Sequence, residues 1–334
     1  MELPKITFFI PTYNEEKRIA RCLESIASQK YPKEKIEILV VDGGSTDKTR
    51  EVAANFPGVK LLDNPKKLAD YGIKIAIREA SGELFVIFAA DNGLASEDWL
   101  DTQAKLFLQN INLSVTWCRM IASGDDAAIN HYYALIQNDP LSFFVNDNLS
   151  IYLKGAISVK INNYACSLFS VDSQKPLIWG ANGLIYRTRL VRDILMRDEF
   201  IADNDVFQIL MERKDNFVAY IPRLYVYHHH LRRLSNWVKK WERNFIHHLL
   251  EQRSSRNMNW IFVPDFKRKM IFWIIYSAIP IFSITQAAYF VIRDKELLWL
   301  YHPLVSFLQM FTYARIILSR KDGWRFIRGI IFGK

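Results

Sequence analysis

EILVVDGGSTDKT, residues 37–49, is a β-rich run that passes directly into a turn rich in Gly, Ser and Asp. It is the second of four such runs, and the segments between them carry apolar residues at helical spacing. The runs are Ile6–Ile10, Ile36–Val41, Val59–Leu62 and Leu84–Phe88. Strand and helix alternating in this way predict a parallel sheet covered by helices on both faces, that is, an α/β fold.

Polar residues follow each run, where an open parallel sheet binds its ligands. The four ends read Pro11-Thr12-Tyr13-Asn14-Glu15, Asp42–Asp47, Asp63–Lys67 and Asp91–Asn92. An aromatic ring, carboxylates and lysines at one edge suit a nucleotide: the ring stacks on a base, carboxylates accept from the base edge and ribose, and cations offset a diphosphate. Neither GxGxxG nor GxxxxGK[ST] is present at these turns. Helix capping by Asn14 and Ser45 is an alternative that leaves Tyr13 and Asp91 unexplained.

Charge divides the 334 residues into two parts. Residues 1–227 hold 26 Lys and Arg against 29 Asp and Glu, whereas residues 228–334 hold 18 against 6. The basic part also contains two uncharged runs, Met270–Ile292 and Leu297–Ala314, which a nucleic-acid-binding stripe does not normally contain. Their lengths predict an antiparallel transmembrane hairpin, or segments that lie partly re-entrant in one leaflet, and in both arrangements the cationic flanks stay on the cytoplasmic side. Buried core helices of a soluble protein are the alternative. We expect membrane lipids, and no nucleic acid, as partners.

Three motifs in order carry a family resemblance: FFIPTYNEEKRIARCLESIASQKYP, EILVVDGGSTDKT and SGELFVIFAADN. Residues 5–100 resemble family 2 glycosyltransferases strongly, and residues 178–230 do so more loosely. The resemblance implies a GT-A fold with a doubly wound mixed sheet and an inverting enzyme that uses a nucleotide-diphosphate sugar. By this analogy, nucleotide-sugar binding falls to Pro11, Thr12, Tyr13, Glu15, Asp42, Lys66 and Asp91. The three scattered cysteines, without a CxxC motif, support neither a disulfide scaffold nor a thiolate zinc site.

The acidic motif departs from the family pattern. Members commonly have Asp-x-Asp, whereas this chain has Ala89-Ala90-Asp91. Asp91 with diphosphate oxygens and waters can still complete the shell of Mg²⁺ or Mn²⁺, so we expect one of these ions as cofactor. In an extended chain, positions 89 and 91 would lie on the same face. The resemblance adds His228 as a second metal ligand, whereas three adjacent histidines cannot all point to one site.

An inverting transfer needs a general base, which in this family belongs to an acidic motif after the acceptor segment. The candidates are Asp203 and Asp205, of which Asp205 is preferred because it directly precedes a helical pattern. On sequence alone, an N-cap role would be the better interpretation of such an Asp.

The expected organisation has four parts. Residues 1–230 form the catalytic domain, 231–268 an amphipathic segment next to the membrane, 269–318 the hairpin and 319–334 a basic tail. Within 231–250, an apolar helical stripe runs from Leu234 to Leu249, and cations lie elsewhere around the helix. This cationic amphipathic helix either lies on an anionic leaflet or packs against the catalytic domain. The acceptor is expected to be lipid-linked, a polyprenyl phosphate or a lipid-linked glycan, and a single sugar is transferred. The alternative function is a catalytically silent nucleotide-binding scaffold at the membrane.

Overall fold

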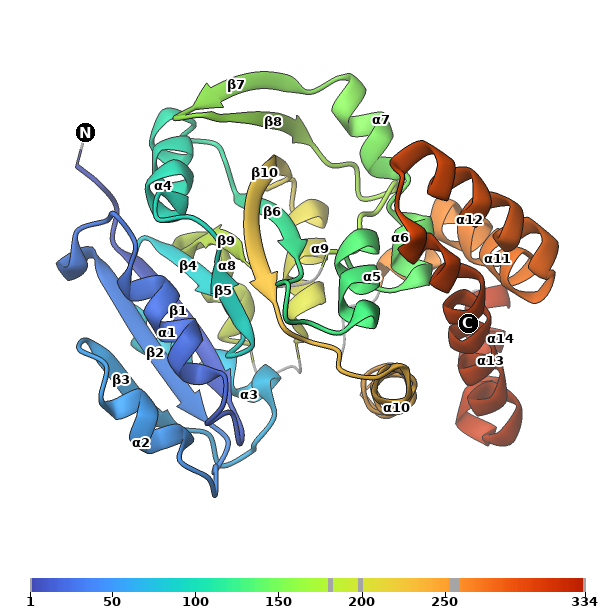
Figure 1. The fold of residues 1–334 in the computed structure, drawn as a ribbon, viewed down its shortest axis with the longest axis horizontal. Helices are drawn as coiled ribbons and strands as arrows, with labels where there is room; N and C mark the ends of the chain where they lie inside the picture. Colours follow the sequence, from blue (N-terminus) through green and yellow to red (C-terminus); the bar gives the residue numbers. More distant parts are fainter. Residues whose placement is uncertain (1, 180–182, 198–200, 253–258, 333–334) are drawn as a thin grey trace. The chain divides into compact units, whose positions relative to one another are not determined.

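The computed structural model describes residues 2–179, 183–197, 201–252 and 259–332 (Figure 1). The chain divides into two compact units. The sheet unit comprises Met1–Ile121, Tyr152–Val171 and Gly180–His229, and the helical unit comprises Ala122–Ile151, Asp172–Trp179 and His230–Lys334. Residues 122–151 and 172–179 therefore group with the C-terminal helices, although they lie within the N-terminal two thirds of the sequence.

Among the described residues, the sheet unit holds one mixed sheet of ten strands, as the sequence predicts. The order is β3-β2-β1-β4-β9-β6-β10-β8-β7, with β5 paired to β10. The strands are β1 (Ile6–Thr12), β2 (Ile36–Asp42), β3 (Val59–Asp63), β4 (Leu84–Ile87), β5 (Asn92–Leu94), β6 (Val115–Ile121), β7 (Ile157–Ile161), β8 (Tyr164–Ser170), β9 (Leu184–Arg187) and β10 (Phe217–His228). Strands β1 to β4 are parallel, and β9 is antiparallel to both of its neighbours, β4 and β6.

Side chains alternate between two covered faces of the sheet. Phe8 packs in a core cluster with Leu23 of α1, whereas the ring of Phe9 lies against Gly72 of α3 on the other face. The helices of this unit are α1 (Ile19–Ala27), α2 (Thr49–Ala54), α3 (Ala69–Glu79), α4 (Trp99–Gln109), α8 (Thr188–Leu195) and α9 (Asp203–Glu212). Register aligns the strand ends, because Thr12 pairs with Asp42 and Asp42 with Asp63. Three of the predicted polar turns therefore share one edge.

The helical unit has a core of its own. Phe245, Phe266 and Phe326 pack together in it, so the end of the predicted stripe within 231–250 points into this core. Its elements are α5 (Ala128–Ile136), α6 (Pro140–Val145), α10 (Leu234–Asn244), the π-helix η2 (Phe245–Glu251), η4 (Asn259–Phe262), α11 (Pro264–Ala278), α12 (Pro280–Asp294), η5 (Leu297–Leu300), α13 (Tyr301–Ser319) and α14 (Lys321–Phe332). Helix α7 (Asn148–Lys154) begins in this unit.

The uncharged run Met270–Ile292 does not form one continuous helix. Helices α11 and α12 divide this run and are bent by 93°. Ile279 between them is extended, as a residue before proline tends to be, and Pro280 has no N–H with which to continue α11. In the described part of the chain, no single helix has the length and hydropathy of a membrane span. Among the described helices, only α11 and α12 taken together reach that length and hydropathy.

Candidate functional site

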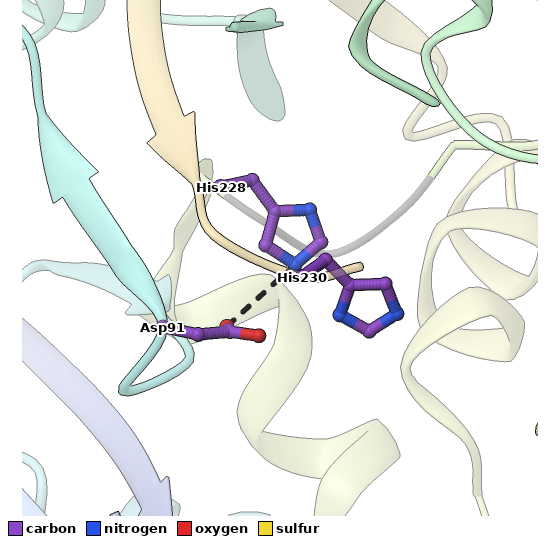
Figure 2. Close-up of side chains that lie close together, drawn as sticks. All are labelled: Asp91, His228 and His230. Carbon is purple, nitrogen blue, oxygen red and sulfur yellow. Dashed lines mark ion pairs between the residues drawn. The ribbon is translucent and has the colours of Figure 1, made fainter. Parts of the chain in front are cut away.

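Asp91 and His228 face each other at one edge of the sheet unit. Asp91 lies in the turn between β4 and β5, and His228 is the last residue of β10. His228 Nε2 is 3.6 Å from Asp91 Oδ1, and the backbone N–H of His229 donates to the Asp91 carbonyl. Figure 2 shows His230 beside this pair, and the ligand atoms of all three residues lie within 4.8 Å of one another. Both acid and imidazole are largely buried.

This arrangement fits a divalent cation. A cation bonded at about 2.1 Å to one carboxylate oxygen and one imidazole nitrogen holds these atoms about 3.0 Å apart at a right angle and about 4.2 Å apart in line. The separation of 3.6 Å between Asp91 and His228 lies in this interval. The two residues predicted from the sequence as metal ligands are therefore brought together.

The turn that leads into α1 places further charges beside Asp91. Arg18 Nη1 lies 3.8 Å from Asp91 Oδ2 and 3.4 Å from Glu15 Oε2. Burial raises the pKa of the Cys22 thiol, and the nearby carboxylates of Asp91 and Glu15 raise it further. This thiol therefore stays protonated at neutral pH.

Ala89 does not occupy an extended segment. The backbone N–H of Asn92 donates to the Ala89 carbonyl at 3.0 Å, which closes a turn over Ala89–Asn92, and β4 already ends at Ile87. The expectation that positions 89 and 91 share one face of an extended chain is therefore wrong. A turn reverses direction within four residues, so the alternation of a strand does not apply to it.

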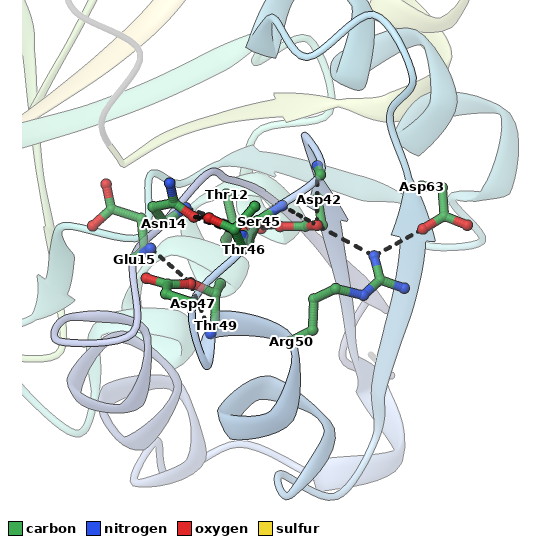
Figure 3. A network of polar contacts seen from close by, with 11 residues as sticks. Thr12, Asn14, Glu15, Asp42, Ser45, Thr46, Asp47, Thr49, Arg50 and Asp63 are labelled. Carbon is green, nitrogen blue, oxygen red and sulfur yellow. Dashed lines mark hydrogen bonds and ion pairs between the residues drawn. The ribbon is translucent and has the colours of Figure 1, made fainter.

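Asp42 organises the turn after β2 (Figure 3). One carboxylate oxygen accepts from the hydroxyls of Thr12 and Ser45. The other accepts from the backbone N–H groups of Gly44 and Ser45 and from Arg50. Arg50 also binds Asp63 at 2.8 Å, which joins the ends of β2 and β3. The side chain of Asp42 is fully buried, so its carboxylate holds the turn after β2 in shape from within.

Hydrogen bonds to the Asp42 carboxylate affect its pKa more than burial does. Burial alone would raise the pKa of Asp42, but the hydrogen bonds from Ser45 and from the neighbouring Arg50 lower it below the ordinary value. Asp42 is therefore ionised at neutral pH. Because the pKa of Asp42 is lower in the folded state, its ionised carboxylate stabilises the fold at any pH above the ordinary carboxyl range. This stabilisation is lost as the pH falls through the lowered pKa.

Asp42→Ala is expected to lower the free energy of unfolding by about 2–4 kcal/mol, because five donors lose their acceptor. Asp63→Ala is the matched control: it removes the other carboxylate on Arg50 but is 83% exposed, so its cost should stay within about 0.5 kcal/mol. Urea unfolding of both variants measures the difference. Equal stabilities would contradict the organising role of Asp42.

The turn after β1 carries the predicted aromatic ring. Tyr13 is 52% exposed, which leaves its ring accessible to a base. The next residue, Asn14, has a positive φ of 56° and receives a hydrogen bond from the Thr46 N–H, and the Glu15 N–H donates to Thr49. Pro11 pairs with Val41, one residue before the last pair of β1, which is Thr12 with Asp42. The turns after β1 and β2 are thus bonded directly to each other.

The lysines follow β3. Lys66 lies with its ammonium 4.5 Å above the ring of Tyr71. The backbone of Lys67 approaches the β2 turn so closely that a Cβ at Gly43 would lie 2.9 Å from its carbonyl oxygen. Glycine is required at this position for the two turns to pack.

The two candidates for the general base lie at the start of α9. Asp205 is fully buried, and its carboxylate accepts from the Ala202 N–H at 3.2 Å, so it closes the first turn of the helix. Asp203 is the first residue of α9, and its side chain lies outside the described residues. Asp205 therefore has a capping role, and its assignment as the base remains a prediction.

A family model compared with the sequence decides the identity of this unit. The model for glycosyl transferase family 2 matches residues 7–173, half of the chain. The chain belongs to glycosyl transferase family 2. Among solved structures, the family 2 chain is similar to the mannosyltransferase PcManGT from Pyrobaculum calidifontis in complex with GDP-Man and Mn2+, with a TM-score of 0.57 and 14% identity over 96% of this chain and 89% of the other. That likeness shows a GT-A fold, as the motifs predict.

Curated relatives match part of this family 2 chain. A dolichyl N-acetyl-alpha-D-glucosaminyl phosphate 3-beta-D-2,3-diacetamido-2,3-dideoxy-beta-D-glucuronosyltransferase from Methanococcus voltae is 40% identical over 108 residues, 30% of this chain and 33% of that protein. Glycosyltransferase AglE from Haloferax volcanii is 35% identical over 104 residues, 30% of this chain and 34% of its own. The match thus spans about a third of the length of each relative.

Sequence reasoning about this family 2 chain missed Arg18 and His230. Arg18 lies three residues after Glu15, the spacing at which side chains meet on a helix, so the sequence contained the signal. His228 and His230 are two residues apart and share a face in an extended chain, which the exclusion of three adjacent histidines overlooked.

Proposed function

We propose that this family 2 chain is an inverting glycosyltransferase that moves one sugar from a nucleotide-diphosphate sugar to a lipid-linked acceptor, a polyprenyl phosphate or a lipid-linked glycan. The observation that carries the proposal is the pairing of Asp91 with His228 at the sheet edge that also holds the Asp42 turn. Support for the acceptor class comes from the dolichyl-linked substrate in the name of the Methanococcus voltae relative.

Each part of the donor has a partner in the sheet unit. The exposed ring of Tyr13 stacks on the base. Asp42 holds the turn after β2 in shape, and this turn places its backbone N–H groups and Thr46 beside the base. Asp91 and His228 hold Mg²⁺ or Mn²⁺. When bound, this cation neutralises charge on the diphosphate and stabilises it as the leaving group. Lys66 adds a positive charge after β3.

The acceptor hydroxyl or phosphate attacks the anomeric carbon from the face opposite the diphosphate, which inverts the configuration there. A carboxylate at the start of α9 accepts the proton of an attacking hydroxyl. Asp205 is the preferred base and Asp203 the second candidate. The reaction takes place at the cytoplasmic face of the cell membrane, where a lipid-linked acceptor presents its head group to the sheet unit.

The test is product analysis of lipid extracts. The detergent-solubilised protein is incubated with Mn²⁺, a polyprenyl phosphate and each of a panel of UDP- and GDP-sugars, and lipids are analysed by mass spectrometry. We expect one donor to give a lipid heavier by a single sugar, with release of the nucleoside diphosphate. The other outcome is that the protein binds the nucleotide but consumes no donor, whether the acceptor is a polyprenyl phosphate or a lipid-linked glycan. That outcome would establish the silent scaffold.

A further inference from the structure

The helical unit exposes an unusually apolar surface. Most of the large apolar side chains that are exposed in the described residues fall between residues 271 and 318, on α11, α12, η5 and α13. Ile281, Ile284 and Ile292 of α12 are 67%, 55% and 79% exposed. A monomer in water rarely exposes so many large apolar side chains on neighbouring helices, which is typical of a surface that meets a partner.

The buried side of the same helices carries polar as well as apolar residues. The buried polar residues of α11, α12 and α13 are Lys269, Ser277, Ser283, His302, Ser306, Gln309 and Thr312. Gln309 accepts from the Leu141 N–H, and His302 bonds to the hydroxyl of Tyr132 at 2.7 Å. Large apolar side chains exposed outside, together with hydrogen-bonded polar side chains among the buried residues, suit a helix bundle whose outer face meets hydrocarbon.

The bend between α11 and α12 makes a wedge. Each helix has 15 residues and is about 22 Å long, shorter than the hydrocarbon core of about 30 Å. With a bend of 93° and equal tilts, the tip at Ile279–Pro280 lies about 16 Å from the line that joins the two outer ends, roughly the depth of one leaflet. At the tip, Ile279, Ile281 and Phe282 are 45%, 67% and 52% exposed.

Charges stand at both outer ends of the wedge and not at its tip. At the first end, Arg268 is exposed, and buried Lys269 bonds to the Val145 carbonyl and to Asn148, which ties this end to the polar interior. At the second end, Arg293 pairs with Asp294 at 2.6 Å, and Lys295 is exposed. Two charged ends around an apolar tip fit a chain that enters and leaves on one side of a bilayer.

We propose that the α11–α12 wedge inserts into a single leaflet, with acyl chains around its tip, and that the loop 293–296 returns to the side from which α11 enters. The adjoining apolar faces of η5 and α13 lie against the same leaflet. The backbone supports such a tip, because Pro280 has no N–H to leave unpaired and the Ile279 N–H and carbonyl are both bonded within the chain. This topology is the opposite of the hairpin expectation, in which the loop faces the other side.

Single cysteines report the side of the membrane. The three native cysteines are buried, so the background labelling is low. Lys295→Cys marks the loop, and Lys30→Cys, at a side chain that is 76% exposed, marks the sheet unit. In sealed vesicles, a membrane-impermeant maleimide should label both positions from the same side and neither from the other. Labelling of residue 295 only from the side opposite residue 30 would overturn the proposal in favour of a span.

Depth is measured on the same protein. A fluorophore on Phe282→Cys, in phosphatidylglycerol and phosphatidylethanolamine vesicles, should be quenched most by lipids with a spin label deep in the acyl chain. The same fluorophore on Lys295→Cys should be quenched most by a label at the head group. If lipids quench neither fluorophore, or if Phe282→Cys instead cross-links to its copy in a second chain, the apolar face is not a lipid surface and the proposal fails. Because no readout depends on sugar transfer, these outcomes are independent of the proposed activity.

Discussion

Asp91→Asn is expected to reduce sugar transfer by about two orders of magnitude or more. The substitution keeps the size of the side chain but removes the charge that holds the cation beside His228. Stabilisation of a leaving group by a bound cation amounts to several kcal/mol, and each 1.36 kcal/mol corresponds to about tenfold in rate. Initial rates with Mn²⁺ varied from sub-stoichiometric to saturating concentrations measure the loss, and EDTA should produce a comparable loss in the unmodified protein.

Glu97→Gln is the control for this substitution. Glu97 is an exposed acid whose ion pair with Lys30 lies on the surface, so neutralising it should leave the transfer rate within about twofold. Full activity of the unmodified protein in EDTA would show that transfer does not use a divalent cation. Lys66→Met should then cost more than EDTA does, because the lysine would have to offset the diphosphate charge.

Asp205→Asn is expected to lower turnover by a factor of about 100 to 10,000 and to leave donor affinity unchanged, because a general base acts in the transition state and not in donor binding. The fold should survive, since an asparagine oxygen can still accept from the Ala202 N–H as the carboxylate does. Single-turnover rates and calorimetric titration with the nucleoside diphosphate separate the two quantities.

Asp203→Asn is the matched comparison, two residues away on the same helix. If this variant loses turnover while Asp205→Asn retains it, the base is Asp203 and Asp205 acts only as the helix cap that its hydrogen bond indicates. If both variants turn over at the unmodified rate, neither residue is the base and the proposed mechanism is wrong.

The N-terminal half of the sheet could be predicted because its pattern is local. Each β-rich run ends in a turn, and the four predicted strands match β1 to β4 within two residues at either end. The parallel order follows from the alternation of strands with helices. The clustering of Thr12, Asp42 and Asp63 then follows from the alignment of parallel strand ends.

The rest could not be predicted, because it depends on contacts between distant residues. Strand β9 inserts between β4 and β6, although residues 122–183 separate it from β6 along the chain. Helices α5 and α6, which follow β6, group with the C-terminal helices. Neither feature leaves a periodicity in the sequence.

Residue counts also misled where the chain bends. A run of 23 uncharged residues has the length of a span, but the count contains no information on direction. Pro280 was the signal, because proline removes a helix hydrogen bond and restrains the residue before it. The turn at Ala89–Asn92 is a second example. Positions 89 and 91 were expected on the same face because they are two residues apart, which holds only in an extended chain.

Binding of Mn²⁺ to the purified protein tests the central claim most directly, because it reports on the pair Asp91 and His228 without needing the correct acceptor. The electron paramagnetic resonance signal of free Mn²⁺ is followed as protein is added in the presence of a nucleoside diphosphate. We expect the unmodified protein to lower the free Mn²⁺ signal well below that of nucleotide alone, and Asp91→Asn and His228→Gln each to remove most of this effect. A signal that the unmodified protein does not change, or that both variants lower equally well, would contradict this expectation.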